Sequence, residues 1–251
     1  MVERVEHVMG MPVRALVRDA VPAAALDGMF GWLRWVDATF SPFVAGSEIG
    51  RIGCGALAPA DAHPLVREVL DRCEALREAT GGAFDVRHSG GLDPCGLVKG
   101  WAVERAASRL LAAGARDLLL DAGGDVVTRG GPWRVGIRHP RRRDRLAAVL
   151  TVRDAAVATS GAYERGEHIR DPRTGRAPAG VESVTVVGPD LGTADAYATA
   201  AFALGAEGPA WTAGLDAYEA MTIVPGDRVL STPGFARHCA GASIAASLEA
   251  A

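Results

Sequence analysis

The sequence has 251 residues, a formal net charge of −3, 49% hydrophobic residues and 23% charged residues. This length and composition support a packed domain of normal size and are unlike those of disordered chains. A slightly acidic chain without a basic face argues against a nucleic-acid partner. We find no run of about 18 uncharged apolar residues, so the sequence also predicts no membrane span.

The four cysteines, Cys54, Cys73, Cys95 and Cys239, include no C-x-x-C pair. Neither a structural zinc site nor a redox pair is therefore predicted, and so few cysteines in a long chain argue against a disulfide framework. The N-terminus has no positively charged start followed by an apolar core, so we expect no secretory signal and a cytoplasmic protein.

The spacing of apolar residues and the turn signals predict a mixture of helices and strands. In chain order they are a strand at 8–17 interrupted at Gly10 and Pro12, helices at 22–35, 64–79 and 97–113, strands at 116–121, 133–138, 146–152, 156–158 and 181–187, a helix through Asp195 to about residue 204, a shorter helix at 209–215, and strands at 220–224 and 228–230. The basic run at 138–145 is interpreted as a solvated turn between strands.

Helices and strands do not alternate regularly, and short turns join most strands. This favours a single α+β domain with a largely antiparallel sheet and packed helices over a doubly wound parallel sheet. We assign this domain to residues 1–232. The Ala- and Gly-rich residues 233–251 are expected to form a loosely ordered tail or a weak peripheral helix.

The helix through Asp195 carries an acid and a hydroxyl four residues apart, Asp195 and Thr199. Positions i and i+4 share one helix face, so the two side chains present hard oxygen atoms to one point, as Mg²⁺ prefers. The competing interpretation is structural: Thr193 caps the helix and Asp195 complements the helix dipole.

Lys99 lies in the first turn of the predicted helix that follows Gly96. Free backbone N–H groups at such a helix start, together with the lysine ammonium, would hold a phosphate. The alternative is an ordinary exposed lysine.

Two further segments have the composition of ligand-binding turns. His168 directly precedes an Asp-Pro-Arg-Thr-Gly turn, although a lone histidine is more often structural than catalytic. Gly123 and Gly124, followed by Asp125, end an apolar strand and suggest a close approach of the backbone to a ligand. They do not form the glycine pattern of a dinucleotide-binding Rossmann fold.

Eight segments, in order, resemble the FAD:protein FMN transferase (ApbE) family. They are Met9-Gly10; Phe40-Ser41-Pro42-Phe43 leading to Ser47-Glu48-Ile49; T-x-G-A-F-D at 80–85; the Lys-Gly segment at 93–104; Gly-Gly-Asp at 123–125; A-T-S-G-x-Y-E-R at 158–165; H-I-x-D-P-R-T-G at 168–175; and A-D-A-x-A-T-A-x-F at 194–202.

The resemblance implies a fold similar to the T-fold and Mg²⁺-dependent transfer of the FMN part of FAD to a Thr or Ser hydroxyl of an acceptor flavoprotein, with release of AMP. It implies Asp195 and Thr199 as side-chain metal ligands and the carbonyl of Gly96 as the backbone ligand, with Leu97 or Val98 as alternatives. Lys99 would neutralise phosphate charge and His168 would accept a proton. The resemblance further implies FAD contacts from Phe43, Glu48, Asp85, Lys99, Asp125, Thr159 and Ser160.

The chain also departs from the family pattern: Gly53 stands where the family has an asparagine, and two connecting segments are short. Two other functions therefore stay open at this point. One is a Mg²⁺-dependent FAD pyrophosphatase, in which water replaces the acceptor hydroxyl. The other is a flavin-binding protein without turnover.

Overall fold

An antiparallel sheet of eight strands forms the centre of the fold in the computed structural model, which describes residues 1–88, 91–161 and 169–240. The strand order is β1-β2-β5-β6-β9-β10-β11-β12, and each neighbouring pair is antiparallel. The strands are β1 (Val2–Val8), β2 (Met11–Val17), β5 (Leu118–Ala122), β6 (Asp125–Arg129), β9 (Ala156–Gly161), β10 (Ser183–Gly188), β11 (Glu219–Val224) and β12 (Arg228–Ser231). Two hairpins lie outside this sheet: β3 (Arg87–His88) with β4 (Gly91–Leu92), and β7 (Trp133–Arg138) with β8 (Leu146–Val152).

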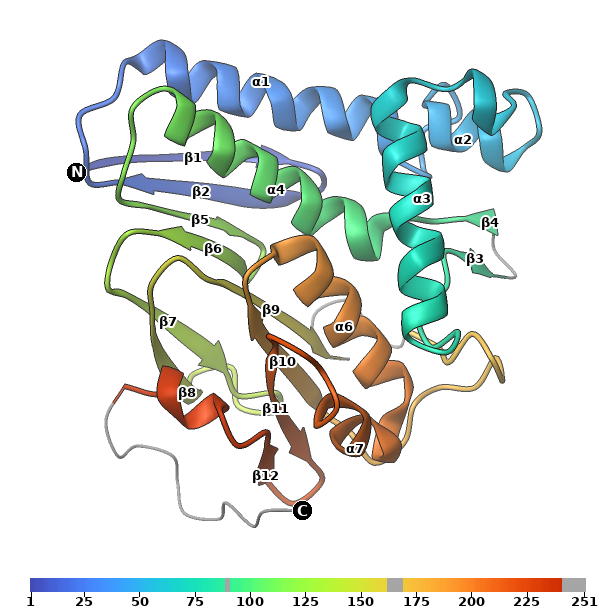
Figure 1. Ribbon diagram of the computed structural model, residues 1–251, viewed down its shortest axis with the longest axis vertical. Coiled ribbons are helices and arrows are strands. Elements are labelled where there is room, and N and C mark those ends of the chain that lie inside the picture. Colours follow the sequence, from blue (N-terminus) through green and yellow to red (C-terminus); the bar gives the residue numbers. More distant parts are fainter. Residues whose placement is uncertain (89–90, 162–168, 241–251) are drawn as a thin grey trace.

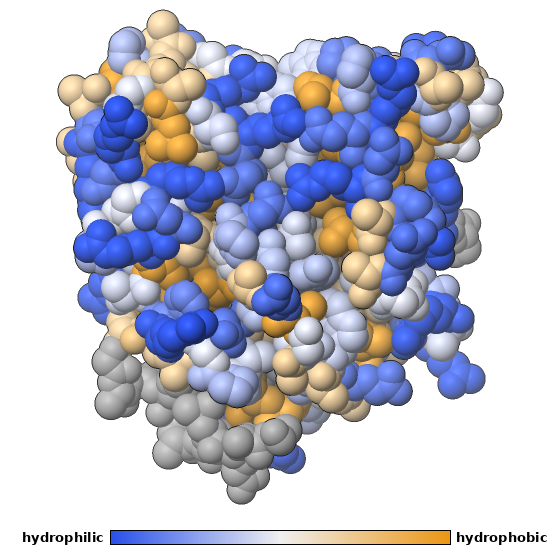
Figure 2. Space-filling view, in the orientation of Figure 1, coloured by the Kyte–Doolittle hydropathy of each residue, from blue (hydrophilic) through white to orange (hydrophobic). Residues whose placement is uncertain are grey.

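Helices cover one face of the sheet (Figure 1). The helices are α1 (Ala23–Phe40), α2 (Glu48–Gly53), α3 (Pro64–Ala79), α4 (Cys95–Ala112), α6 (Leu191–Ala203) and α7 (Gly208–Thr212), with short 3₁₀ turns at Pro59–Asp61, Gly205–Glu207 and Phe235–His238. The outer surface of this layer is mostly hydrophilic, with small separate hydrophobic areas (Figure 2). The apolar sides of the helices therefore face the sheet.

Two cores lie on opposite faces of the sheet, because successive side chains of a strand point to opposite sides. In β9, Ala156 and Ala158 belong to the core under the helices, whereas Val157 belongs to a second core under the β7–β8 hairpin. We call these the helix-side core and the hairpin-side core. The hairpin thus closes the face that the helices leave open.

The first strand prediction is wrong in its topology. The segment at 8–17 is not one interrupted strand but the end of β1, a turn and β2. Met9 and Gly10 have φ angles of 55° and 72°, the left-handed pair that a two-residue hairpin turn requires. The Met9 amide donates a hydrogen bond to Asp37 Oδ2 of α1 at 3.1 Å, which holds this non-glycine residue in an uncommon conformation.

The predicted α+β class with a largely antiparallel sheet is confirmed. The helix predicted at 64–79 matches α3, and α4 begins two residues before the predicted start. The sequence did not predict β1, β6 or α2. The run at 138–145 does join β7 and β8, as predicted, and Arg141 and Arg142 there pair with Asp227.

Part of the predicted tail packs on the domain. Phe235 is fully buried in the hairpin-side core, and Cys239 pairs with Leu150 of β8. Residues 241–251 lie outside the described residues, and the division at residue 232 stays a prediction. Across the described ranges, every helix is too short or too polar to cross a bilayer.

Candidate active site

The site is built where α4 crosses α6, and glycines make that crossing close. A Cβ at Gly100 would lie 2.5 Å from the carbonyl oxygen of Leu191, and one at Gly192 would lie 3.2 Å from the amide nitrogen of Trp101. Only residues without a side chain allow the two helices to approach this far. The second turn of α4 therefore lies directly against the first turn of α6.

Two buried carboxylates and a half-buried ammonium group meet at this crossing. The Lys99 ammonium of α4 lies 2.5 Å from Asp125 Oδ2 of β6 and 3.7 Å from Asp195 Oδ2 of α6. Asp125 and Asp195 are only 1% and 3% exposed. Burying a charge is costly unless it is paired, so the three groups form one electrostatic unit. The alternative interpretation of Lys99 as an ordinary exposed lysine is wrong.

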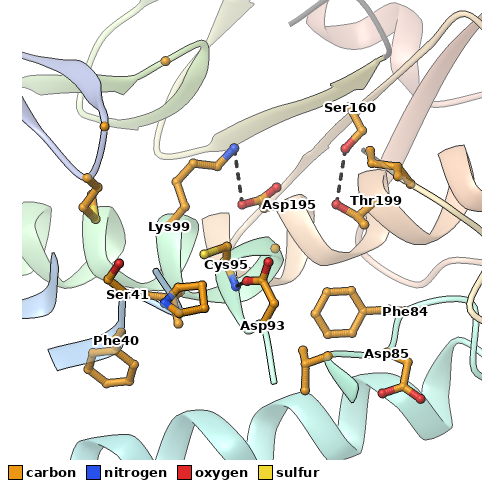
Figure 3. Close-up of a pocket in the computed structure, with 18 of the residues that line it drawn as sticks. Phe40, Ser41, Phe84, Asp85, Asp93, Cys95, Lys99, Ser160, Asp195 and Thr199 are labelled. Carbon is orange, nitrogen blue, oxygen red and sulfur yellow. Dashed lines mark hydrogen bonds and ion pairs between the residues drawn. The ribbon is translucent and has the colours of Figure 1, made fainter. Parts of the chain in front are cut away.

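Hydroxyl groups continue the polar surface along α6. Thr199 Oγ1 lies 3.3 Å from Ser160 Oγ of β9, so these two side chains point toward one another (Figure 3). A Cβ at Gly96 would lie 3.7 Å from Thr199 Oγ1 and 3.1 Å from the Phe84 ring. Gly96 and Thr199, two of the three residues that the family resemblance implies as metal ligands, thus lie side by side.

The start of α6 is fixed by Asp190 rather than by Thr193. The Asp190 carboxylate accepts hydrogen bonds of 2.8 Å from both the amide and the hydroxyl of Thr193, and pairs with Arg72 at 2.8 Å. Burial opposes its ionisation, but these donors hold the pKa of Asp190 below its ordinary value. The prediction that Thr193 caps the helix is wrong, since Thr193 is the donor to the cap.

A turn after α3 supplies an aromatic wall. Gly81 and Gly82 have φ angles of 58° and 81°, the left-handed conformation in which many helices end. The buried Thr80 hydroxyl donates to the Leu76 carbonyl at 2.8 Å and accepts from the Phe84 amide at 3.0 Å. These bonds fold the chain back so that Phe84 packs beside Gly96.

A second turn continues this wall. Arg173 makes two side-chain bonds of 2.9 Å to the buried Asp171 carboxylate. These bonds hold the pKa of Asp171 below its ordinary value. The Arg173 side chain also lies near Gly82, so the turn at 171–175 packs on the turn after α3.

These elements surround a cavity of about 1030 Å³, at the upper end of the range for small-molecule sites. Its walls come from α1, α4, α6, β9, the Met9–Gly10 turn and the turns at 83–87 and 169–175. Most of the predicted site residues line it, namely Phe43, Asp85, Gly96, Lys99, Thr159, Ser160, Asp195 and Thr199.

Two predicted residues lie outside the cavity lining. Asp125 lies behind Lys99 and accepts a hydrogen bond from the Thr159 amide at 3.1 Å. Glu48 begins α2 and accepts from the His63 amide at 2.7 Å. Their predicted FAD contacts stay predictions. His168 lies outside the described residues, and its neighbour Ile169 lines the cavity.

Several lining residues were not predicted. Phe84, Cys95 and Asp37 face the cavity from three different elements. Asp93 had a readable signal, because it precedes a Pro at a helix start, and it accepts from the Cys95 amide at 2.9 Å. Asp37 had none, since only the fold brings it to the Met9–Gly10 turn.

The donor set at the α4–α6 crossing fits a hard divalent cation. It combines a carboxylate, a hydroxyl and an adjacent glycine backbone, all of them oxygen donors of the kind Mg²⁺ takes. Among the described residues, no group of three or more His, Cys, Asp or Glu side chains is arranged to hold a metal. A metal here would therefore need Thr199 and the Gly96 carbonyl besides Asp195.

Comparison with known proteins points to one family. Residues 86–222 match the model of the ApbE family. The chain is 34% identical over 213 residues to the FAD:protein FMN transferase of Rhodobacter capsulatus, which covers 77% of this chain and 40% of that protein. It is 31% identical over 229 residues to the FAD:protein FMN transferase of Treponema pallidum, with 78% and 63% covered. The chain thus spans between 40% and 63% of the length of these two relatives.

Solved structures show the same fold. The flavin transferase ApbE from Vibrio cholerae superposes with a TM-score of 0.82 at 21% identity, covering 94% of this chain and 98% of that one. The ApbE protein of Thermotoga maritima superposes with a TM-score of 0.83 at 23% identity and the same coverage. The matched fold extends well beyond residues 86–222.

Proposed function

Because the chain belongs to the ApbE family, we propose that it is a flavin transferase, which moves the FMN part of FAD to a Thr or Ser hydroxyl of an acceptor protein and releases AMP. One observation carries the proposal. A dinucleotide-sized cavity ends at a buried carboxylate and at a half-buried hydroxyl and lysine, and phosphoryl transfer needs such groups to position and neutralise phosphates.

The reaction balances without an oxidant or reductant. The acceptor hydroxyl oxygen bonds to the FMN-side phosphorus of FAD while the bond from that phosphorus to the bridging oxygen breaks. AMP leaves with the bond's electron pair, and the hydroxyl proton passes to a base. Catalysis is then mainly a matter of alignment and of charge neutralisation at the pyrophosphate.

Mg²⁺ would be held by Asp195, Thr199 and the Gly96 carbonyl, where it would supply Lewis-acid stabilisation to the phosphate oxygens. Lys99 reaches the same end of the cavity, so its ammonium can neutralise phosphate charge. The Lys99 ammonium lies between the carboxylates of Asp125 and Asp195, and these fix the position of its Nζ atom before substrate binds.

His168 is our proposed proton acceptor. The residues that directly follow it, Ile169, Arg170 and Asp171, line the cavity. An imidazole titrates near neutral pH, which suits a general base for an alcohol.

We assign the remaining predicted FAD contacts to other residues in and around the cavity. Phe43 is 85% exposed at its rim and offers a ring for stacking. Asp85, Thr159 and Ser160 offer polar contacts. We propose that Glu48 and Asp125 contribute from behind the lining. The acceptor flavoprotein and a cytoplasmic setting remain predictions.

The test is incubation of the purified chain with FAD, Mg²⁺ and a panel of Thr- and Ser-containing segments of flavoproteins, each paired with its Thr→Ala or Ser→Ala version. We expect AMP in equal amount to acceptor-bound flavin, measured by chromatography and by flavin fluorescence of the denatured acceptor. The alanine versions should give none.

Other outcomes discriminate the two alternative functions. FMN and AMP produced at the same rate with and without acceptor would indicate a pyrophosphatase. Tight FAD binding that survives Asp195→Ala, with no AMP from the intact chain, would indicate a flavin-binding protein and contradict the proposal.

A further inference from the structure

One charged group near the candidate metal site contacts Lys99 without lining the cavity. Asp125 is 1% exposed, does not line the cavity, and lies at the start of β6 with its carboxylate against Lys99. Burying a carboxylate costs free energy, so its presence here calls for an explanation.

The distances around Lys99 suggest that role. The ammonium lies 2.5 Å from Asp125 Oδ2 but 3.7 Å from Asp195 Oδ2. The lysine is therefore held in direct contact with the acid that does not line the cavity and farther from the acid that does. Asp125 thus competes with Asp195 for the same ammonium group.

We propose that Asp125 is a positioning residue that draws the Lys99 ammonium away from Asp195 and so leaves the Asp195 carboxylate to a divalent cation. The inference rests on the proposed function, since it assumes the metal site. Without the Asp125 charge, the ammonium is drawn toward Asp195, and that ion pair competes with the cation for the same oxygen atoms.

The isosteric variant Asp125→Asn tests this without removing the structural bond at this position. The amide side chain of the variant still offers an oxygen to the Thr159 amide, from which Asp125 Oδ1 accepts a hydrogen bond of 3.1 Å. The second variant, Asp125→Asn with Lys99→Met, also removes the competing ammonium. Asp121→Asn is the matched control, because Asp121 is an acid on the neighbouring strand whose bond to the Gly124 amide an asparagine can keep.

The readout is Mn²⁺ binding, which electron paramagnetic resonance measures directly as loss of the free-ion signal. Mn²⁺ accepts the same oxygen donors as Mg²⁺. We expect Asp125→Asn to weaken Mn²⁺ binding at least tenfold, about 1.4 kcal/mol, and the double variant to recover most of that loss. Asp121→Asn should stay within twofold of the wild type.

Each failure has its own meaning. If Asp125→Asn binds Mn²⁺ as tightly as the wild type, the proposed role of Asp125 is overturned, and the metal site is not. The same conclusion follows if the double variant binds Mn²⁺ as weakly as Asp125→Asn. Absence of Mn²⁺ binding by the wild-type chain overturns the metal site, and with it this inference and the metal-dependent part of the proposed function. Circular dichroism of each variant checks that the fold is retained.

Discussion

The two faces of the central sheet are both buried, but they are built from different chemistry. Under the helices, apolar side chains share the interior with Lys99, Asp125 and Asp195 and with the hydroxyls of Ser160 and Thr199. Under the β7–β8 hairpin, the core is formed by aliphatic and aromatic side chains such as Trp133, Leu150 and Phe235.

The difference separates function from stability. Apolar burial is favourable wherever it occurs, whereas buried charges cost free energy unless they are paired. The hairpin-side core can therefore be assigned to stability. The polar end of the helix side is expected to be functional, and substitutions on the two faces should affect different measurements.

The largest expected effect is on the helix side and on catalysis. Asp195→Asn removes the only side-chain charge from the proposed ligand set, so AMP release should fall by about 10³-fold, about 4 kcal/mol in the activation free energy. The unfolding free energy should change by less than about 1 kcal/mol, because Lys99 keeps its closer partner Asp125. Steady-state AMP assays and urea denaturation check both, and activity within tenfold of the wild type would remove Asp195 from the proposed site.

Leu150→Ala tests the other face. Leu150 is fully buried in the hairpin-side core, so its truncation should cost about 3 kcal/mol of unfolding free energy through lost contacts and a cavity. FAD affinity of the folded protein should stay within twofold, measured by flavin fluorescence. A tenfold loss of affinity would show that the two faces are not independent.

Gly100→Ala probes the helix crossing, which contributes both to stability and to the geometry of the site. The added Cβ would meet the Leu191 carbonyl at 2.5 Å, so the helices must separate, at about 2 kcal/mol of stability and with weaker Mn²⁺ binding. Gly28→Ala is the control, since no atom lies within 4 Å of its Cβ position in α1. That change should stabilise the protein by about 0.5–1 kcal/mol. Equal effects of the two substitutions would contradict the close crossing.

The smallest expected effect concerns the start of α6. Asp190→Ala removes the helix cap and should cost about 1 kcal/mol at neutral pH. The pKa of Asp190 is lowered on folding, so its contribution is present above the ordinary value of 3.8 and is lost as the pH falls through the folded value. The stability difference between wild type and variant should therefore shrink below about pH 4, as urea denaturation at several pH values would measure.

Sequence analysis did not predict β1, because the side chains of this strand do not alternate between apolar and polar. In β1 the valines occur at every third position, so no strand alternation is visible. The half-buried positions of that strand are Val2, Arg4 and Glu6, and Arg4 pairs with Asp27 and lies over the Phe30 ring. Inward-pointing charges of this kind protect edge strands from pairing with other chains, and they also hide the strand from sequence analysis.

Local periodicity by itself determined the main helices and the shared helix face of Asp195 and Thr199, because i and i+4 spacing depends on helix geometry alone. The order of the elements and the short turns between strands determined the antiparallel class. Only the tertiary structure decided that Lys99 of α4 and Asp125 of β6 meet Asp195. That meeting depends on how closely α4 and α6 cross over the sheet, and the contacts at Gly100 and Gly192 set this distance between elements far apart in the chain.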